Sequence, residues 1–461
     1  MKTNMLVPGM TLQIQKVHSI SSGMMVWIAS AAAFLSIIPI WLNYDIISPD
    51  GAFQYIPTAR FFLEGNFLAG LSQPQPFFPL LIAGFSWVTG INPELSGRLL
   101  SAGAFILAAL GMLKLTELIF HDKWIALIAV LFLITNRELA EDSVDCLKES
   151  LLVGCILWGN YLVLKGIVVP DKQRVFMFLA GILFLFGMFM RSTALIFLEA
   201  WLIIWVFGKN GSRLMRTSLL LIPAVGFALM WFINPDLPFY KKSYNLGLIL
   251  NDPQSMYGIL QAAGLTVIDF FSTGNPLIIL IGGIGLFYRK KDVYSIHLCL
   301  VMIIFLMILS AWGFVSGRYL LVLIAWIYPL AAYTTMNMAR SMNRFGKFAS
   351  FLVILTACAF WIDKALETPD INKIARRDAG LFILEHAGPN RDVITNRDRL
   401  AFYAEGKYIP LEEAAGLKKS SSIFAIDTEK TDGKSEKTEM ELLGKKPARI
   451  FDTIYVYLPG S

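Results

Sequence analysis

Long apolar segments alternate with short polar stretches over most of the chain. A helix needs about 20 apolar residues to cross the ~30 Å hydrocarbon core of a bilayer. The segments that meet or approach this length are 24–43, 98–119, 124–136, 149–166, 174–190, 193–208, 215–233, 275–289, 295–313, 318–336 and 347–362. We therefore expect a mainly α, polytopic membrane helix bundle of about eleven spans over residues 1–362.

Beyond residue 362 the apolar segments stop and the composition becomes that of an ordinary small domain. The stretches around Ala379–Tyr403 and Ile450–Leu458 alternate between apolar and polar residues, which is typical of strands. The pattern predicts a small α/β domain over residues 363–461.

Phe77–Ile91 is a short, apolar, proline-led run that either crosses the membrane or lies at its surface. The basic loops decide between the two. If this run does not cross and the N-terminus is cytoplasmic, five Lys- or Arg-containing loops face the cytoplasm, as the positive-inside rule requires: 121–123, 165–174, 209–216, 289–292 and 340–347. The same topology predicts that loops 44–97, 137–148 and 234–274 and the C-terminal domain face outward, in the periplasm of a cell with an inner membrane.

Composition supports membrane residence and excludes several functions. Hydrophobic residues make up 56% of the chain and charged residues 16%, against about 25% charged in soluble domains. The net charge of +6 comes from the short basic loops, so it does not indicate nucleic-acid binding. No Walker loop or nucleotide-binding glycine motif is present, and the four cysteines have no metal-ligand spacing. We expect no nucleotide cofactor; a divalent cation stays open.

The first outward loop carries candidate chemistry close to the membrane. Asp45 and Asp50 follow the first span, and Ser48-Pro49-Asp50-Gly51 has the composition of a turn. Gln54–Gly65 is predicted to form a short amphipathic helix with Tyr55, Ala59 and Phe62 on one face. Asp50 is therefore either a helix cap or a functional carboxylate, and the spacing favours neither.

The second outward loop is acidic. Asp142, Asp145 and Glu149 have the i, i+3, i+7 spacing of one helix face that runs into the next span. Acids at the first turn of a helix suit its dipole. If they meet the first loop over one cavity, they can instead bind a cation or hold a general base.

Two arginines lie at the ends of apolar segments on the same predicted side. Arg191 separates two spans, and Arg318 begins another and is followed by Tyr319. Charges at such positions are costly and are usually paired or functional, and a guanidinium binds a phosphate group through two hydrogen bonds. The alternative is that each side chain only extends to the interface.

Several segments, in order, resemble bacterial membrane glycosyltransferases of the GT-C fold, of the protein-mannosyltransferase-like family 39 type that includes the lipid A aminoarabinose transferases. The run from Ser48 to Gly65 is similar to their first-loop signature. The motifs Gln-Pro-Gln-Pro-Phe-Phe-Pro-Leu at 73–80, Glu-Leu-Ser-Gly-Arg-Leu-Leu-Ser at 94–101 and Arg-Tyr-Leu-Leu at 318–321 resemble later ones.

This resemblance implies a transferase that takes a sugar from a polyprenyl-phosphate donor and passes it to a glycan, lipid or protein acceptor. By position, Asp50 matches the acid that deprotonates the acceptor hydroxyl, and Arg318 matches the late arginine near the lipid phosphate. Asp142 or Asp145 corresponds to a second-loop acid. Gly51 and Gln75 depart from the mannosyltransferase pattern, so neither mannose nor a protein acceptor follows from the resemblance.

The leading hypothesis is thus a membrane glycosyltransferase with Asp50 as base and with Asp45, Tyr55, Asp142, Asp145, Arg191, Arg318 and Tyr319 binding substrate. One alternative is a lipid or solute transporter, which predicts matching inverted halves. The other is a non-catalytic scaffold, which would tolerate loss of both acidic loops.

Overall fold

The computed structural model describes residues 21–43, 46–73, 75–207, 228, 253–289, 292–312, 317–341, 343–368, 371–411, 413, 423–427 and 447–459. The chain divides into two compact units. The first comprises Met1–Trp41 and Thr58–Leu366, and the second comprises Leu42–Pro57 and Glu367–Ser461. The segment around Asp50 thus belongs to the same compact unit as the C-terminal residues.

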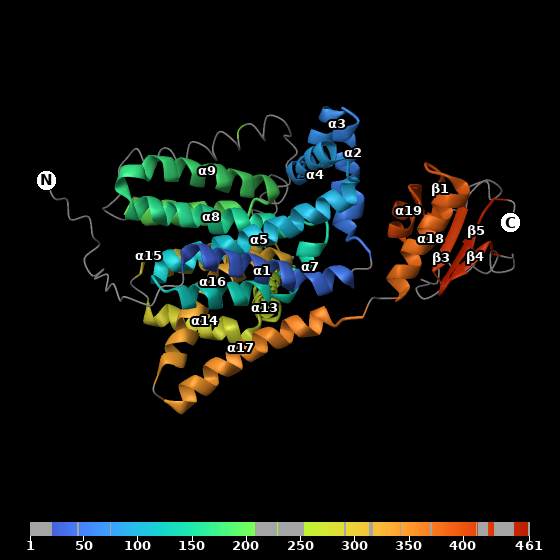
Figure 1. The fold of residues 1–461 in the computed structure, drawn as a ribbon. Helices are drawn as coiled ribbons and strands as arrows, with labels where there is room; N and C mark the ends of the chain where they lie inside the picture. The colour runs from blue at the N-terminus through green and yellow to red at the C-terminus, as the bar shows by residue number, and fades with distance from the viewer. Residues whose placement is uncertain are drawn as a thin grey trace. The chain divides into compact units, whose positions relative to one another are not determined.

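The first unit is a helix bundle (Figure 1). Its helices are α1 (Ser22–Leu42), α2 (Ile56–Leu63), α3 (Phe67–Leu71), α4 (Phe77–Thr89), α5 (Pro93–Phe120), α6 (Lys123–Ile134), α7 (Arg137–Val144), α8 (Glu149–Val168), the 3₁₀ turn η2 (Pro170–Lys172), α9 (Gln173–Met190), α10 (Ala194–Phe207), α13 (Pro253–Gly274), α14 (Pro276–Tyr288), α15 (Val293–Trp312), α16 (Gly317–Arg340) and α17 (Arg344–Ala365). Helices α5, α8 and α9 lie side by side, and α16 packs against α6, α14 and α17.

Six of the described helices are long and apolar enough to cross a membrane, and the bent pair α13–α14 makes a seventh if it forms one span. Helices form at each predicted span within the described residues, whereas the predicted span 215–233 lies outside them, apart from residue 228. The prediction of a mainly α, polytopic bundle with a small C-terminal sheet is confirmed. Phe77–Ile91 forms the 13-residue helix α4, and its surface placement stays a prediction.

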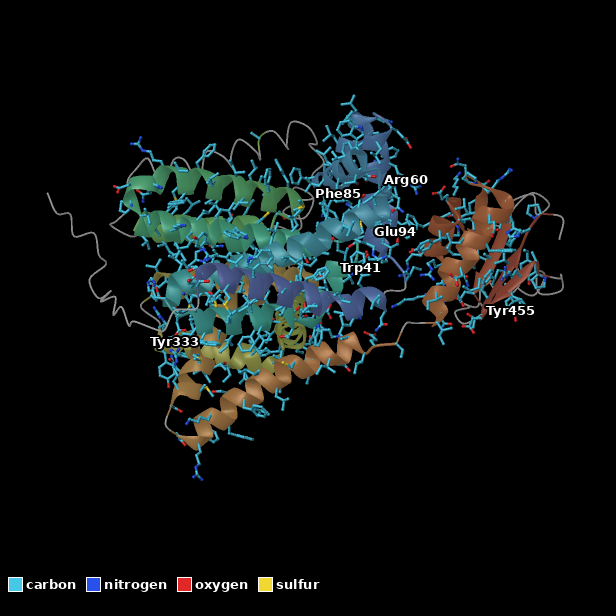
Figure 2. All side chains as sticks on the ribbon, in the orientation of Figure 1. Trp41, Arg60, Phe85, Glu94, Tyr333 and Tyr455 are labelled. Carbon is cyan, nitrogen blue, oxygen red and sulfur yellow. The ribbon has the colours of Figure 1, made fainter. Side chains whose placement is uncertain are left out.

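Short polar residues begin the helices at the tight connections of the bundle. Asn92, Asp122 and Asn136 each accept hydrogen bonds from backbone N–H groups in the first turn of α5, α6 and α7. Such caps satisfy donors that have no partner within a helix. Because apolar helices follow one another with few loop residues, these caps fix where each helix starts. Near the C-terminal end of α1, Trp41 is labelled in Figure 2. The Arg98 guanidinium of α5 lies over its ring, 4.5 Å from the ring centroid.

Helix α13 forms in the last part of 234–274, the segment predicted as an outward loop, and its side of the membrane stays a prediction. Asn275 follows α13 with a φ of 62° and accepts a hydrogen bond from Leu277 N–H, and Pro276 begins α14. This left-handed residue and proline turn the chain by 104° between the two helices. The sequence predicted a span at 275–289, where α14 lies, but no helix over α13, because polar residues such as Gln261, Thr266 and Asp269 interrupt the apolar residues of that segment.

The first outward loop contains the predicted helix in a modified form. It starts as a π-helical turn, η1 (Gly51–Tyr55), and continues as α2. Tyr55, Ala59 and Phe62 are all buried, as their spacing predicts. Gly65 ends the helix with a φ of 78°, and Asn66 N–H donates to the Phe61 carbonyl in the glycine-terminated pattern common at helix C-termini.

The second unit contains a five-stranded sheet with two helices. Its elements are α18 (Ile371–Ala387), β1 (Asp392–Thr395), α19 (Asp398–Tyr403), β2 (Lys407–Pro410), β3 (Ile423–Asp427), β4 (Arg449–Phe451) and β5 (Ile454–Tyr457). The strand order is β2-β1-β3-β5-β4, with β2, β1 and β3 parallel and β5 antiparallel to both of its neighbours.

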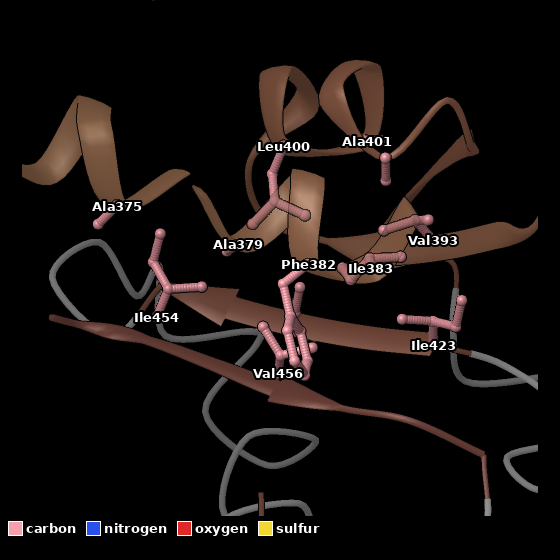
Figure 3. Packing of buried hydrophobic residues seen from close by; sticks show 12 residues of the cluster. Ala375, Ala379, Phe382, Ile383, Val393, Leu400, Ala401, Ile423, Ile454 and Val456 are labelled. Carbon is pink, nitrogen blue, oxygen red and sulfur yellow. The ribbon is translucent and has the colours of Figure 1, made fainter. Parts of the chain in front are cut away.

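Helix α18 covers one face of this sheet (Figure 3). Ala379, Phe382 and Ile383 point into a core that includes Val393 and Val456. The expectation that the strand pattern begins at Ala379 is wrong, because this segment is the end of α18. The spacing of these three residues is that of one helix face, and the alternation of apolar and polar residues is too short there to distinguish the two.

Candidate active site

Helices α7, α8 and α16 and the connection between α9 and α10 bring charged side chains together in the bundle. Helix α7 is held in place by its cap. The Asn136 side-chain amide donates to the Tyr328 hydroxyl of α16 at 2.9 Å and to the Thr273 carbonyl of α13 at 3.0 Å. Because Asn136 also caps α7, one residue fixes both the start of this short acidic helix and its neighbours.

Arg191 is at the centre of the charged group. Its Nη2 lies 2.6 Å from Glu149 Oε1, and its Nη1 donates to the Arg318 carbonyl at 3.2 Å. The guanidinium also covers the Tyr319 ring at 4.2 Å. The side chains of Arg191 and Glu149 are only 10% and 1% exposed. Arg191 therefore joins the start of α8 to the start of α16 through a buried ion pair.

Asp142 and Arg318 form the second charged pair. Arg318 Nε lies 3.7 Å from Asp142 Oδ1, and the Asp142 side chain is 4% exposed whereas that of Arg318 is 32% exposed. Burial raises the pKa of Asp142 well above its usual range, the neighbouring Glu149 carboxylate raises it further, and the Arg318 guanidinium opposes both. Asp142 thus holds its proton at a higher pH than an ordinary aspartate does.

The prediction that Asp142, Asp145 and Glu149 share one helix face is wrong. Helix α7 ends at Val144, Asp145 has an extended backbone, and α8 begins at Glu149. Asp145 is buried, and its Oδ1 accepts a hydrogen bond from Cys146 N–H at 2.6 Å.

The break between α7 and α8 is stabilised by α5. Ser101 Oγ donates to the Leu147 carbonyl at 2.6 Å, and Arg98 Nε donates to the Val144 carbonyl at 2.9 Å. Backbone groups that leave a helix need such partners when they are buried. Asp142 and Glu149 therefore come close from two separate helices.

Four buried side-chain oxygens near the ends of these elements make no hydrogen bond within the described part of the chain. They are Asp142 Oδ2, Glu149 Oε2, Ser150 Oγ and Thr193 Oγ1. An unsatisfied polar atom in a buried position costs free energy, and such groups are uncommon in folded proteins. This site therefore has unused acceptors and hydroxyl groups beside two guanidinium groups.

The segment around Asp50 is described within its own compact unit. Asp50 is half-buried at the start of η1 and makes no capping hydrogen bond with its side chain. Ser48 Oγ accepts from Gly51 N–H at 3.2 Å instead. Helix capping, one of the two roles considered for Asp50, is therefore carried out by Ser48 instead.

The same segment is anchored to α19. Ile47 N–H donates to the Tyr403 hydroxyl at 3.1 Å, and the Phe53 ring meets Phe402 edge-on at 6.5 Å. Tyr55 is buried, and Asp45 lies outside the described residues. Contacts with α19 thus fix the backbone before Asp50, at Ile47, and after it, at Phe53.

Sequence reasoning missed the role of Glu149 as the partner of Arg191. The two residues are 42 positions apart, and nothing in their local patterns links them. The only signal was that both lie at the ends of apolar segments, where charge needs a partner. Among the residues that the structure describes, no three His, Cys, Asp or Glu side chains are grouped as metal ligands.

Asp142→Asn is expected to raise the thermal unfolding midpoint at about pH 8 and to change it little in mild acid. Because the folded protein raises the pKa of Asp142, protonation stabilises the fold at low pH, and this contribution is lost as the pH rises through the raised pKa. Above that pH the wild-type protein must bury an ionised carboxylate, which lowers its stability. Asparagine carries no charge, so the variant does not have this cost. Unfolding curves of the detergent-purified proteins across this range provide the measurement. Asp171→Asn, at an exposed residue of η2, is the control, and a gain from Asp142→Asn that is equal at every pH contradicts the account.

Fold and sequence comparisons define the class of protein. The structure is similar to ArnT from Cupriavidus metallidurans in the apo state, with a TM-score of 0.60 and 12% identity over 94% of this chain and 97% of that chain. ArnT bound to undecaprenyl phosphate gives a TM-score of 0.59 with the same identity and coverage. The Archaeoglobus fulgidus oligosaccharyltransferase complex with zinc and sulfate matches with a TM-score of 0.51 and 14% identity, over 84% of this chain and 62% of that chain.

The chain therefore has the GT-C fold of membrane glycosyltransferases. Residues 72–235 match the sequence model of the dolichyl-phosphate-mannose-protein mannosyltransferase family. No curated protein matches the chain in sequence. The predicted resemblance and the glycosyltransferase class are confirmed by the family match and the fold together.

Proposed function

We propose that this protein transfers a sugar from a polyprenyl-phosphate donor to an acceptor hydroxyl on the outer face of the membrane. The observation that carries the proposal is the pair of arginines at the ends of apolar helices. Arg191 is neutralised by Glu149, and Arg318 keeps about a third of its side chain exposed beside the more distant Asp142. Arg318 is therefore the guanidinium better placed to bind an incoming phosphate.

The donor is supported by the kind of ligand that similar proteins bind. ArnT from C. metallidurans has been solved with undecaprenyl phosphate, and the archaeal oligosaccharyltransferase AglB from A. fulgidus has been solved with dolichol phosphate and an inhibitory peptide (TM-score 0.50, 12% identity). A phosphate group on a long isoprenoid needs cations where apolar helices end, and this is where Arg191 and Arg318 lie.

In the proposed transfer reaction, Asp50 acts as the general base and Arg318 stabilises the leaving group. The Asp50 carboxylate accepts the proton of the acceptor hydroxyl, whose oxygen attacks the anomeric carbon of the sugar. The bond from that carbon to the phosphate oxygen breaks, and the electron pair leaves with the polyprenyl phosphate. Arg318 stabilises the charge that develops on this leaving group. No nucleotide takes part in this sequence.

The remaining proposed residues bind or position substrate. Arg191 and Tyr319 hold the Arg318 backbone in place, while Asp142 and the neighbouring buried oxygens offer hydrogen-bond acceptors to sugar hydroxyl groups. Tyr55 is assigned to substrate binding beside Asp50, and Asp45 and Asp145 are assigned to it from their sequence positions in the first and second outward loops. The acceptor, whether glycan, lipid or protein, enters from the outer face, where the basic loops and the positive-inside rule put both acidic loops and the C-terminal domain.

Arg318→Gln is expected to weaken binding of polyprenyl phosphate by about tenfold or more, because a charge-assisted, two-point contact with the phosphate is lost. Native mass spectrometry of the detergent-purified protein with undecaprenyl phosphate measures the bound fraction. Arg344→Gln, at an exposed residue that starts α17, is the matched control and should bind as the wild-type protein does. Equal binding by the Arg318 and Arg344 variants would remove the basis of the proposal.

A further inference from the structure

The carboxyl edge of the small sheet carries a second group of arginines. Strand β1 lies between β2 and β3, and all three run parallel. From β1 the chain passes through α19 to β2 on one side, whereas β3 lies on the other side of β1. The order of the strands therefore reverses between β1 and β3, and open parallel sheets bind ligands at the carboxyl ends of strands at such a point.

Asp427, the last residue of β3, is at the centre of this edge and is fully buried. Arg397, which follows β1, donates from Nε to Asp427 Oδ2 at 2.7 Å, and Arg376 of α18 donates to the same oxygen from Nε and Nη2 at 3.2 Å. Thr453 Oγ1 donates to Asp427 Oδ1 at 2.9 Å. Residues from three other parts of the fold thus meet on the Asp427 carboxylate.

The backbone at this edge is fixed by Asn396. Its side-chain amide donates to the Asp427 carbonyl at 2.8 Å and accepts from Asp427 N–H at 3.0 Å. These two bonds continue the contact between β1 and β3 past the end of the ladder. Arg397 therefore projects from a rigid position.

The charges of this cluster are not balanced by the side chains that the structure describes. Two guanidinium groups face one carboxylate within the described residues, and their side chains are only 11% and 14% exposed. Arg397 Nη2 is buried and donates no hydrogen bond to any described group. A partly buried excess positive charge with an unused donor is unfavourable by itself, and it is relieved when an anion binds.

We infer that Arg376 and Arg397 form a binding site for a small oxyanion, a phosphate or a carboxylate group, at the carboxyl edge of β1 and β3. If Arg376 and Arg397 only stabilised the fold, their ion pairs with Asp427 would explain the nitrogen atoms that face this carboxylate. Within the described residues it leaves the second positive charge and Arg397 Nη2 without a counterpart. Planar guanidinium groups bind both kinds of oxyanion through paired hydrogen bonds. The inference does not depend on the proposed transfer reaction.

Chemical modification of the full-length, detergent-purified protein tests the site directly. Phenylglyoxal reacts with accessible guanidinium groups, and mass spectrometry of the peptides gives the rate at each arginine. Inorganic phosphate and glucuronate are added in separate arms. In at least one arm we expect the rate at Arg397 to fall about tenfold, with Arg391 unchanged because it is exposed and, among the described residues, its side chain donates to the Ala387 carbonyl alone. Protection by phosphate alone identifies a phosphate group, protection by glucuronate alone identifies a carboxylate, and protection by both supports either oxyanion. Unchanged rates in both arms overturn the inference.

Variants locate the binding in the C-terminal domain. Calorimetric titration with the protecting anion should give an affinity about tenfold lower for Arg397→Gln, an intermediate affinity for Arg397→Lys, and the wild-type affinity for Arg391→Gln. Arg318→Gln, in the bundle, should leave this binding unchanged. If Arg397→Gln binds the anion as well as the wild-type protein does, the site is not the one inferred. The modification experiment on wild-type protein gives its answer even where a variant does not fold.

Discussion

Asp50→Asn is expected to lower sugar transfer by a factor of about 10² to 10⁴, the usual contribution of a positioned general base. Asparagine has nearly the same shape as aspartate but cannot accept the acceptor proton. The fold should be unaffected, since Ser48 rather than Asp50 provides the capping hydrogen bond at this helix. Transfer from a polyprenyl-phosphate-linked sugar by membranes that contain equal amounts of each protein gives the measurement.

Two controls make the Asp50 result specific. Glu64→Gln changes an exposed acid just after α2 and should retain full activity. Elution of Asp50→Asn from a sizing column at the wild-type volume shows that the protein remains folded. Full activity of Asp50→Asn would exclude its role as base and would return the scaffold and transporter hypotheses to consideration.

Glu149→Gln is expected to destabilise the bundle by about 3–5 kcal/mol, the usual cost of removing one partner of a buried ion pair. The Arg191 guanidinium, whose side chain is 10% exposed and lies 2.6 Å from Glu149, would then remain buried without its counter-charge. Thermal unfolding of the purified protein should show a clearly lower midpoint. Replacing both Glu149 and Arg191 by leucine should recover part of the loss, because no unpaired charge then remains.

The control for this prediction is an ion pair of similar length at the protein surface. Arg137 and Asp363 lie 2.8 Å apart, but their side chains are 39% and 69% exposed. Solvent screens such a pair, so Arg137→Gln should cost no more than about 1 kcal/mol. If Glu149→Gln and Arg137→Gln lower the midpoint equally, the buried pair does not hold α8 and α16 together as described.

The apolar helices of the bundle could be predicted from the sequence because length and composition determine them locally. The same holds for the helix that contains Ala59 and Phe62, whose buried face follows from its spacing. The break between α7 and α8 could not be predicted, since Ser101 and Arg98, which stabilise it, belong to α5. The sequence around the break does not show that residues of a distant helix will bind its backbone carbonyls.

The sequence pointed to Arg191, Arg318 and Asp142, which take part in two ion pairs of the bundle, but not to Glu149 as the partner of Arg191. The two arginines are conspicuous because charge at the end of an apolar segment is costly, and Asp142 because it belongs to an acidic loop. Which acid pairs with which arginine depends on how α8 and α16 pack, and this information is not present in any short segment. In the C-terminal domain, likewise, the helical position of Ala379 follows from its packing on the sheet rather than from local alternation.

The central claim is that the protein consumes a polyprenyl-phosphate-linked sugar. The most direct measurement compares the polyprenyl-phosphate sugars and the cell-surface glycans and glycolipids of cells that have and lack this protein. The account predicts that one lipid-linked sugar accumulates in cells lacking the protein and that one glycan or glycolipid loses that sugar. Wild-type protein should reverse both changes, and Asp50→Asn should reverse neither. Unchanged amounts of every lipid-linked sugar and every glycan would contradict the account.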